Sequence, residues 1–474
     1  MADHNSGVEA NLAELEAQIQ ETLNEIQQTN QKLCSLSTPG EFEACERKIG
    51  ELTDRLAGLM TGLQLQRAIA SEKVEKEAAG LMAAMGKKFK NQGQRLVEVK
   101  LLRGGSVRIW VSYYTLKKAE KKRKKRGCGL YPELMVLGIY DRCTPLLASE
   151  VSLLSVAASS FEEARCLLER QGIELDVKTI QEIAYRFARR AKVERDQQRL
   201  IVGEQVAGRR VTVSTDGGRV RLREKKKGAK RKKGKRSPYQ TAWREPKLLI
   251  IYVINEKGEK EKTFVPLIDA SLKGPGALMK LIEHYLRNLG ITRADRVVFV
   301  ADGAPWIWGR LPGLIASLGL KPEQVVEVID FYHVVEHLGK VAELDKKWTS
   351  GKRKQWVKQQ RKRLLEGKVE AVLKAVEEIC GERKSQAAAR EMEYFRKHQL
   401  RMQYAMFKSE GLPIGSGAVE SAIRRVINLR LKGAGIFWKR ENADVMLLMR
   451  SYYKAGRWEM LKEMAFARPL ALVA

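Results

Sequence analysis

The sequence predicts an α/β protein in which a mixed β-sheet carries an all-α insertion and follows a mainly helical N-terminal region. Three observations lead to this prediction. Strand-like and helix-like segments alternate over residues 205–334, strand patterns are almost absent from residues 335–410, and a heptad pattern runs through residues 10–77. Strands repeat every two residues and helices about every 3.6, so each segment can be assigned in turn.

Residues 1–78 are predicted to be helical, with two heptad series separated by a break. Thr38 is placed to cap the second helix, with Pro39 at its first position and Glu41 completing a capping box. Such helices form either an intramolecular hairpin or a dimerising coiled coil, and the pattern allows both. The second alternative predicts a homodimer or a higher homo-oligomer. The seam positions are Leu12, Leu15, Ile19, Thr22, Ile26, Thr29 and Leu33, then Phe42, Cys45, Ile49, Leu52, Leu56, Leu59 and Leu63.

Residues 79–127 are predicted to form a β-hairpin followed by a basic linker. Polar and apolar residues alternate over 94–115 around a turn at Gly104 and Gly105. Residues 117–126 then hold eight basic residues and one acid. Such a run favours contact with solvent or phosphate over burial in a core.

Residues 128–200 are predicted to be helical, in a helix-turn-helix arrangement. Ser159 or Ser160 caps the first helix, Gly172 ends it and Asp176 opens the second. The basic end of the second helix is typical of a DNA-recognition helix, although an ordinary helical hairpin has the same spacing. Its basic residues are Arg186, Arg189, Arg190 and Lys192.

Residues 205–334 predict the first part of the core, with the order β-β-β-α-β-α-β. Three adjacent strands followed by two crossovers match the ribonuclease H-like fold, a mixed sheet flanked by helices. Residues 335–410 are predicted to be an α-helical insertion. Residues 411–474 are predicted to supply the C-terminal helices of the core.

The charge of the chain indicates a polyanionic partner. It has 88 Lys and Arg against 57 Asp and Glu, a net charge of +31, and the positive residues are clustered. Nucleic acid explains this better than a solubilising surface. The six cysteines form no C-x-x-C pair, which predicts reduced thiols and no zinc ribbon. Because neither a signal peptide nor a membrane span is evident, we expect a cytoplasmic, nucleoid-associated protein without a membrane partner.

Three carboxylates are candidate metal ligands. Asp216 and Asp302 each end an apolar strand and precede a glycine, and Glu420 follows a glycine-rich segment near the start of a helix. In the predicted fold the first and fourth strands are neighbours, so the two aspartates would lie side by side. Mg²⁺ prefers oxygen ligands, and two such ions can activate the nucleophile and stabilise the leaving oxygen at a phosphodiester. We therefore expect a catalytic site for two Mg²⁺ ions, for which Mn²⁺ would substitute.

A family resemblance is carried mainly by residues 415–458. Their sequence, GSGAVESAIRRVINLRLKGAGIFWKRENADVMLLMRSYYKAGRW, is similar to the C-terminal signature of bacterial insertion-sequence DDE transposases. It is most similar to the ISKra-type group, relatives of the Mutator-like transposases. The strings VADGAPWIW and DFYHVVEHL resemble two further blocks of that group, and the likeness covers roughly residues 205–460. It implies a triad of Asp216, Asp302 and Glu420 and a helical insertion before the glutamate. The paired cysteines of many family members are represented here by Cys128 alone.

Further residues are expected to support the site or to contact DNA. The resemblance implies that Asp330 and His333 support the active site or contact the scissile strand, whereas a purely structural role is the alternative for the histidine. Residues 219–236 hold twelve basic residues and one acid directly after Asp216, which predicts a hairpin loop or arm on DNA phosphates. The predicted DNA-contact residues are Arg219, Arg221, Arg223, Lys225, Lys226, Lys227, Lys230, Arg231, Lys232, Lys233, Lys432, Lys439 and Arg440.

These features together predict a transposase that binds the ends of its insertion sequence, cleaves DNA by metal-assisted hydrolysis and joins the 3′-hydroxyl to target DNA. Two alternatives stay open. One is a ribonuclease H-like, structure-specific nuclease that only hydrolyses. The other is a transposase-derived DNA-binding protein without catalysis, which would not depend on the three acids.

Overall fold

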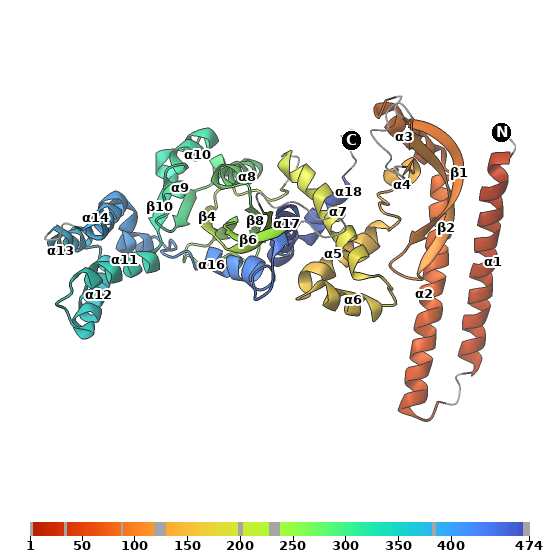
Figure 1. The fold of residues 1–474 in the computed structure, drawn as a ribbon, viewed down its shortest axis with the longest axis horizontal. Coiled ribbons are helices and arrows are strands. Elements are labelled where there is room, and N and C mark those ends of the chain that lie inside the picture. Colours follow the sequence, from red (N-terminus) through yellow and green to blue (C-terminus); the bar gives the residue numbers. More distant parts are fainter. Residues whose placement is uncertain are drawn as a thin grey trace. The chain divides into compact units, whose positions relative to one another are not determined.

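The computed structural model describes residues 3–32, 36–86, 89–117, 129–197, 202–226, 238–381 and 385–467. Residue contacts divide the chain into two units, residues 1–191 with 462–474 and residues 192–461 (Figure 1). Most of the predicted basic linker lies outside the described residues. The same holds for five predicted DNA-contact residues, Lys227, Lys230, Arg231, Lys232 and Lys233.

The first unit begins with a helical hairpin, one of the two arrangements that the heptads allowed. Helices α1 (Asp3–Lys32) and α2 (Pro39–Ile69) pack against each other, and α3 (Glu72–Ala84) follows (Figure 1). The predicted capping box is confirmed, because Thr38 accepts a hydrogen bond from the Glu41 backbone and the Glu41 side chain accepts one from Thr38. Self-association stays a prediction.

A β-hairpin follows, as predicted. Strands β1 (Phe89–Lys100) and β2 (Ser106–Leu116) are antiparallel, and β3 (Gly129–Leu130) pairs with β2. In the connecting turn Gly104 has a φ of 72°, which glycine adopts without strain. A Cβ at Gly104 would stand 2.5 Å from the carbonyl oxygen of Asp54, so glycine also lets α2 pack closely on this turn.

Four helices complete this part of the chain, and the helix-turn-helix boundaries are confirmed. Ser160 accepts a hydrogen bond from the first turn of its helix, and Asp176 accepts two from the first turn of the next. Gly172 lies between them with a φ of 75°. The helices are α4 (Pro132–Val136), α5 (Pro145–Ala157), α6 (Phe161–Glu169) and α7 (Val177–Asp196).

Two of the arginines predicted for DNA recognition on α7 are engaged inside the first unit. Arg186 forms an ion pair with Asp141. The guanidinium of Arg190 lies 4.2 Å from the Tyr140 ring centroid and donates to the carbonyl of Ala465 at 3.1 Å. DNA recognition by α7 stays a prediction, and these two side chains would have to leave their partners to take part.

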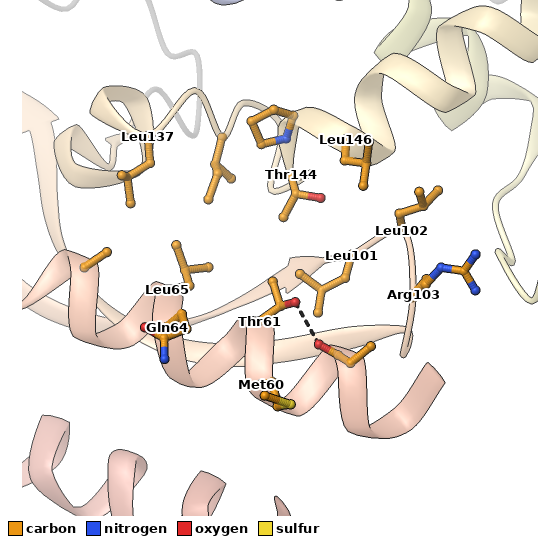
Figure 2. Close-up of a pocket in the computed structure, with 14 residues that line it drawn as sticks. Met60, Thr61, Gln64, Leu65, Leu101, Leu102, Arg103, Leu137, Thr144 and Leu146 are labelled. Atoms are coloured by element: carbon orange, nitrogen blue, oxygen red, sulfur yellow. Dashed lines mark hydrogen bonds between the residues drawn. The ribbon is translucent and has the colours of Figure 1, made fainter. Parts of the chain in front are cut away.

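An open apolar pocket belongs to the first unit. It lies among α2, the turn after β1 and the start of α5, and Figure 2 shows Leu65, Leu101 and Leu137 lining it. Leu146 stands at the same pocket with 59% of its surface exposed. The candidate carboxylates all belong to the second unit.

A five-stranded mixed sheet forms the core of the second unit. Its order is β10-β9-β4-β7-β8, with β4, β9 and β10 parallel and β7 antiparallel to both of its neighbours. The predicted succession of strands and crossover helices is found, and the first and fourth core strands, β4 and β9, are neighbours as expected. The strands are β4 (Arg210–Gly217), β7 (Lys247–Ile254), β8 (Leu267–Ser271), β9 (Arg296–Ala301) and β10 (Val325–Ile329).

Helices cover the sheet. Helix α8 packs on β7 and β8, α16 on β4 and β7, and α17 on β8, which explains why every residue of β7 is buried. None of the helices in the described part of the chain is long and apolar enough to cross a membrane. The helices around the sheet are α8 (Pro275–Asn288), α9 (Pro305–Trp308), α10 (Leu311–Leu318), α16 (Gly417–Ile423) and α17 (Arg440–Ala455). Helix α18 (Trp458–Phe466) follows α17 in the chain.

The segment after β10 is helical, as predicted, and begins a few residues earlier than expected. Its helices pack on one another beside β10 (Figure 1). They are α11 (Phe331–Leu344), α12 (Ser350–Leu365), α13 (Val369–Gly381), α14 (Gln386–His398) and α15 (Tyr404–Ser409).

Part of the basic arm that we expected to be a loop is a strand. A second sheet has the order β11-β5-β6, formed by β5 (Val220–Lys225), β6 (Tyr239–Arg244) and β11 (Trp438–Lys439). Val220 and Leu222 are fully buried, and the arginines between and after them are only partly exposed. Buried and more exposed residues alternate along β5, but the high charge of residues 219–236 makes this alternation difficult to recognise in the sequence.

A buried polar network ties the start of the second unit to its sheet. Arg195 on α7 is 1% exposed and its guanidinium lies 2.8 Å from the carboxylate of Asp269 in β8. The other oxygen of Asp269 accepts from the Tyr285 hydroxyl at 2.8 Å, and that hydroxyl is 2.7 Å from the hydroxyl of Tyr452. Each buried charge therefore has a hydrogen-bonded partner.

Candidate active site

Three neighbouring parallel strands lead into aspartates at the same edge of the sheet. The register of β4 with β9, continued by two residues, places Asp216 beside Asp302. The register of β9 with β10, continued by one residue, places Asp330 on the other side of Asp302. The backbone N–H of Asp330 donates to the carbonyl of Ala301 at 2.8 Å, which extends the pairing to this point. The sheet thus lines up three carboxylates in a row.

The first two aspartates are partly buried and fixed by their own turns. One oxygen of Asp216 accepts a hydrogen bond from the N–H of Gly217. One oxygen of Asp302 accepts from the N–H of Ala304 at 3.0 Å, while Trp308 donates its indole N–H to the Asp302 carbonyl at 2.6 Å. Among the described residues, the second oxygen of each carboxylate accepts no hydrogen bond and is left for a ligand.

Glu420 reaches the same edge from α16, which packs on β4 and β7. The hydroxyl of Ser416 donates to one oxygen of Glu420 at 3.1 Å, and the rest of the glutamate side chain is exposed. The helix continues as a π-helical turn, Arg424–Asn428. Such turns are rare and are frequent at functional sites.

The three acids influence one another electrostatically. Burial, together with the negative charges of Asp302 and Glu420, raises the pKa of Asp216 from 3.8 to about 6, against the opposing effects of the Gly217 hydrogen bond and His333. A carboxylate that is partly desolvated beside like charges holds its proton more tightly. The carboxylates of Asp302 and Glu420 lie far from Asp216 in the sequence, and both raise its pKa in the folded protein.

Asp330 has a different environment from the other acids. It is fully buried, and its carboxylate accepts hydrogen bonds from the backbone N–H of His333 at 2.8 Å and from that of Ser416. It therefore joins the start of α11 to the segment that leads into α16, and its role in supporting the active site stays a prediction. The ring of His333 lies 3.3 Å from Glu336.

The chemistry of the triad fits a divalent cation. Asp216, Asp302 and Glu420 offer only oxygen ligands, which Mg²⁺ and Mn²⁺ prefer, and a cation would offset the repulsion that raises the pKa of Asp216. Within the described ranges, however, no three histidine, cysteine, aspartate or glutamate side chains are grouped closely enough to surround an ion. The acids would have to draw together around it.

Several predicted DNA-contact residues gather on the second sheet. Lys439 of β11 pairs with Arg223 of β5, although the two are far apart in the sequence. The Arg223 guanidinium lies 4.3 Å from the ring centroid of Tyr239, and Arg221 lies 5.7 Å from that of Trp243. The remaining predicted contacts in the described segments, Arg219, Lys225, Lys226, Lys432 and Arg440, are exposed, and Arg440 also donates to the carbonyl of Leu272.

Two charged residues near Asp216 carry no signal in the sequence. Lys247 pairs with Gly217 across the sheet, is 5% exposed, and places its ammonium 2.7 Å from Glu245 and 4.5 Å from the Trp306 ring centroid. A Cβ at Gly217 would overlap the Glu245 carboxylate, so a larger residue there would displace this exposed side chain. Only the antiparallel pairing of β7 with β4 brings these residues to the site.

A tyrosine from the insertion was also missed. A Cβ at Gly303 would overlap the ring of Tyr394 on α14, so this ring lies directly on the turn after Asp302. Burial and the carboxylates of Asp302 and Asp330 raise the pKa of Tyr394 well above its ordinary value. Its hydroxyl therefore stays protonated at neutral pH.

Comparison with known proteins gives little beyond this geometry. The chain matches no family model and no curated protein. Among solved structures it is similar to one described as a Drosophila P element transposase strand transfer complex, with 11% identity and a TM-score of 0.34, over 67% of this chain and 93% of that chain. A likeness at this level assigns neither a fold nor an activity.

Proposed function

We propose that this chain is a DDE-type DNA transposase with a ribonuclease H-like catalytic core. The observation that carries the proposal is the alignment of Asp216 and Asp302 at the ends of neighbouring parallel strands, with the negative charge of Glu420 acting on the first of them. The mixed order of the sheet supports the assignment of the core, and the sequence of residues 415–458 supports the ISKra-type group.

In the proposed reaction, water attacks the phosphorus at the end of the element, and the 3′ oxygen leaves with a proton as a hydroxyl. That hydroxyl then attacks a phosphate of the target DNA, so one phosphodiester bond forms as another breaks. Two Mg²⁺ ions, or Mn²⁺, held by the triad would activate the attacking oxygen and stabilise the leaving one. Asp330 holds the segment before Glu420 in place through Ser416.

The proposed partners are the DNA ends of the element and the target DNA, with the basic second sheet contacting phosphates. Because two ends must be brought together, the active form would be a homodimer or a higher homo-oligomer. The proposed location is the bacterial cytoplasm, on the nucleoid.

The decisive experiment incubates the protein with the DNA that flanks its own gene and Mg²⁺, and maps the 3′ ends produced. Cleavage at the element ends is expected for the wild type and for Asp295→Asn, an aspartate that is half exposed and paired with Arg210 outside the acid row. Asp302→Asn should abolish cleavage. Failure of correctly folded wild-type protein to cut these ends would count against the proposal.

A second assay separates the two alternatives. Pre-cleaved ends with a free 3′-hydroxyl are offered together with target DNA. Joined product is expected from a transposase, whereas a structure-specific nuclease would give only shortened strands. A non-catalytic DNA-binding protein would give neither product, and Asp302→Asn would then behave as the wild type in every assay.

A further inference from the structure

Tyr394 brings a hydroxyl group of the helical insertion to the edge of the acid row. Its ring occupies the space where Gly303 lacks a side chain, immediately after Asp302. Two independent segments therefore meet here, the strand-end turn of the sheet and helix α14. No regular spacing in the sequence links them.

The ring is held firmly. It stacks on the imidazole of His337 with centroids 3.7 Å apart and planes 9° from parallel, and that imidazole lies 2.6 Å from the carboxylate of Glu391. Phe395 and His398 contact the ring at centroid distances of 5.5 Å and 5.1 Å. A ring confined on several sides points its hydroxyl in a fixed direction.

The hydroxyl itself has no hydrogen-bond partner among the described residues, although its oxygen is buried. A buried polar group without a partner lowers stability, and native proteins keep few of them, often where a ligand completes the bond. By contrast, the hydroxyl of Tyr404, on the next helix, is buried and donates to the carbonyl of Ile329 at 3.0 Å. The fold therefore gives the Tyr404 hydroxyl a hydrogen-bond acceptor. Among the described residues it gives none to the Tyr394 hydroxyl, which lies near Asp302.

We propose that the Tyr394 hydroxyl donates a hydrogen bond to a phosphate oxygen of the DNA strand bound at Asp302. The inference rests on the proposed function, because it takes the acid row to be the place where a DNA phosphate binds. A protonated phenol is a donor, and a phosphate oxygen is a strong acceptor. The helical insertion thus contributes directly to the site that the sheet forms.

The test compares Tyr394→Phe with Tyr404→Phe as a matched control. Each removes one buried hydroxyl and keeps the ring. For Tyr394→Phe we expect an unchanged or higher melting temperature, because an unpartnered group is removed, together with roughly tenfold weaker binding to a labelled duplex of the element end. For Tyr404→Phe we expect a lower melting temperature and unchanged affinity in the folded protein.

A modified DNA tests whether a phosphate oxygen accepts the hydrogen bond from Tyr394. Replacing the phosphate at the cleavage position by a neutral methylphosphonate should weaken binding by the wild type, and much less by Tyr394→Phe, because the two changes remove the same bond. Equal losses in both proteins would overturn the proposal. So would wild-type affinity of Tyr394→Phe, or a loss of stability as large as that of Tyr404→Phe.

Binding is measured in Ca²⁺, without turnover, so that this inference and the proposed function fail separately. Wild-type protein that binds the duplex but never cuts it in Mg²⁺ would refute the proposed function and still leave the methylphosphonate comparison to decide the role of Tyr394. Cleavage that requires Asp302 but is indifferent to Tyr394→Phe, with full affinity, would refute the inference alone.

Discussion

Replacing Asp216 by asparagine should stabilise the second unit at neutral pH. Burial and the neighbouring carboxylates raise the pKa of Asp216 to about 6 in the folded protein, from 3.8. Each pKa unit corresponds to about 1.4 kcal/mol, so the shift corresponds to about 3 kcal/mol. Because the folded state holds the proton more tightly than the unfolded state, the wild type loses this stability as the pH rises from about 4 to about 6. Asparagine does not ionise, so the variant does not lose this stability as the pH rises.

The variant changes little besides the charge, since asparagine keeps an oxygen that can accept the hydrogen bond from Gly217. Urea unfolding at about pH 4 and about pH 7.5, without divalent ions, measures the effect. The free energies of unfolding of the two proteins should nearly coincide at the lower pH and differ by up to about 3 kcal/mol at the higher pH, with the variant more stable.

Two further variants control this prediction. Asp295→Asn, with about half of its side chain exposed, should show no comparable pH-dependent gain. In Asp302→Asn the loss of stability with rising pH should occur at a lower pH than in the wild type, because the variant lacks one of the charges that raise the pKa of Asp216. A variant Asp216→Asn that is less stable than the wild type at pH 7.5, or a gain that does not depend on pH, would refute the reasoning.

Three further predictions concern the fold and the DNA surface. Asp269→Asn removes one of the two carboxylates that pair with the buried Arg195, the other being Asp196, and should lower the free energy of unfolding by about 1–3 kcal/mol in urea, and an unchanged value would contradict this. Gly303→Ala should displace the Tyr394 ring and destabilise the unit by about 1–3 kcal/mol, measured in the same way, with Gly313→Ala as a control where a Cβ meets no neighbour. Charge removal from the second sheet should reduce the slope of log affinity against log salt by roughly 0.9 for each phosphate that the protein no longer neutralises, and an unchanged slope would exclude this surface. The residues to change to glutamine are Arg221, Arg223 and Lys439.

The parts of the site that the sequence predicted are those set by local patterns. Asp216 and Asp302 stand at the ends of apolar strands, and a strand followed by Asp-Gly can be recognised within about ten residues. The β4–β9 pairing then follows from the order of the elements. For the same reason the caps at Thr38 and Asp176 were predicted correctly, and Ser160 was one of two candidates for the third, since each cap depends on a few adjacent residues.

What was missed depends on contacts between distant segments. Glu420 was predicted, but its prediction rests more on the family resemblance than on spacing, because Ser416 and the packing of α16 bring it back to the sheet after a long insertion. Strand β5 was missed because the high charge of its sequence hides the alternation of buried and exposed residues, and only its pairing with β11 involves residues more than two hundred positions away. Tyr394 reaches the site through the fold of the insertion alone. The heptads allowed a hairpin and a coiled coil because the same apolar seam serves both.

The helical insertion leaves the sheet and returns to it at nearly the same point. The N–H of Phe331 donates to the carbonyl of Ile414 at 2.9 Å, and Asp330 accepts from the Ser416 backbone one step further on. Because entry and exit are fastened together, the number of residues between them is free to vary, and the entropy of closing a longer excursion grows only slowly. In evolution such a segment can be enlarged, trimmed or exchanged without disturbing the acids. Homologues would therefore be aligned better on this closure than on the separation of Asp302 from Glu420.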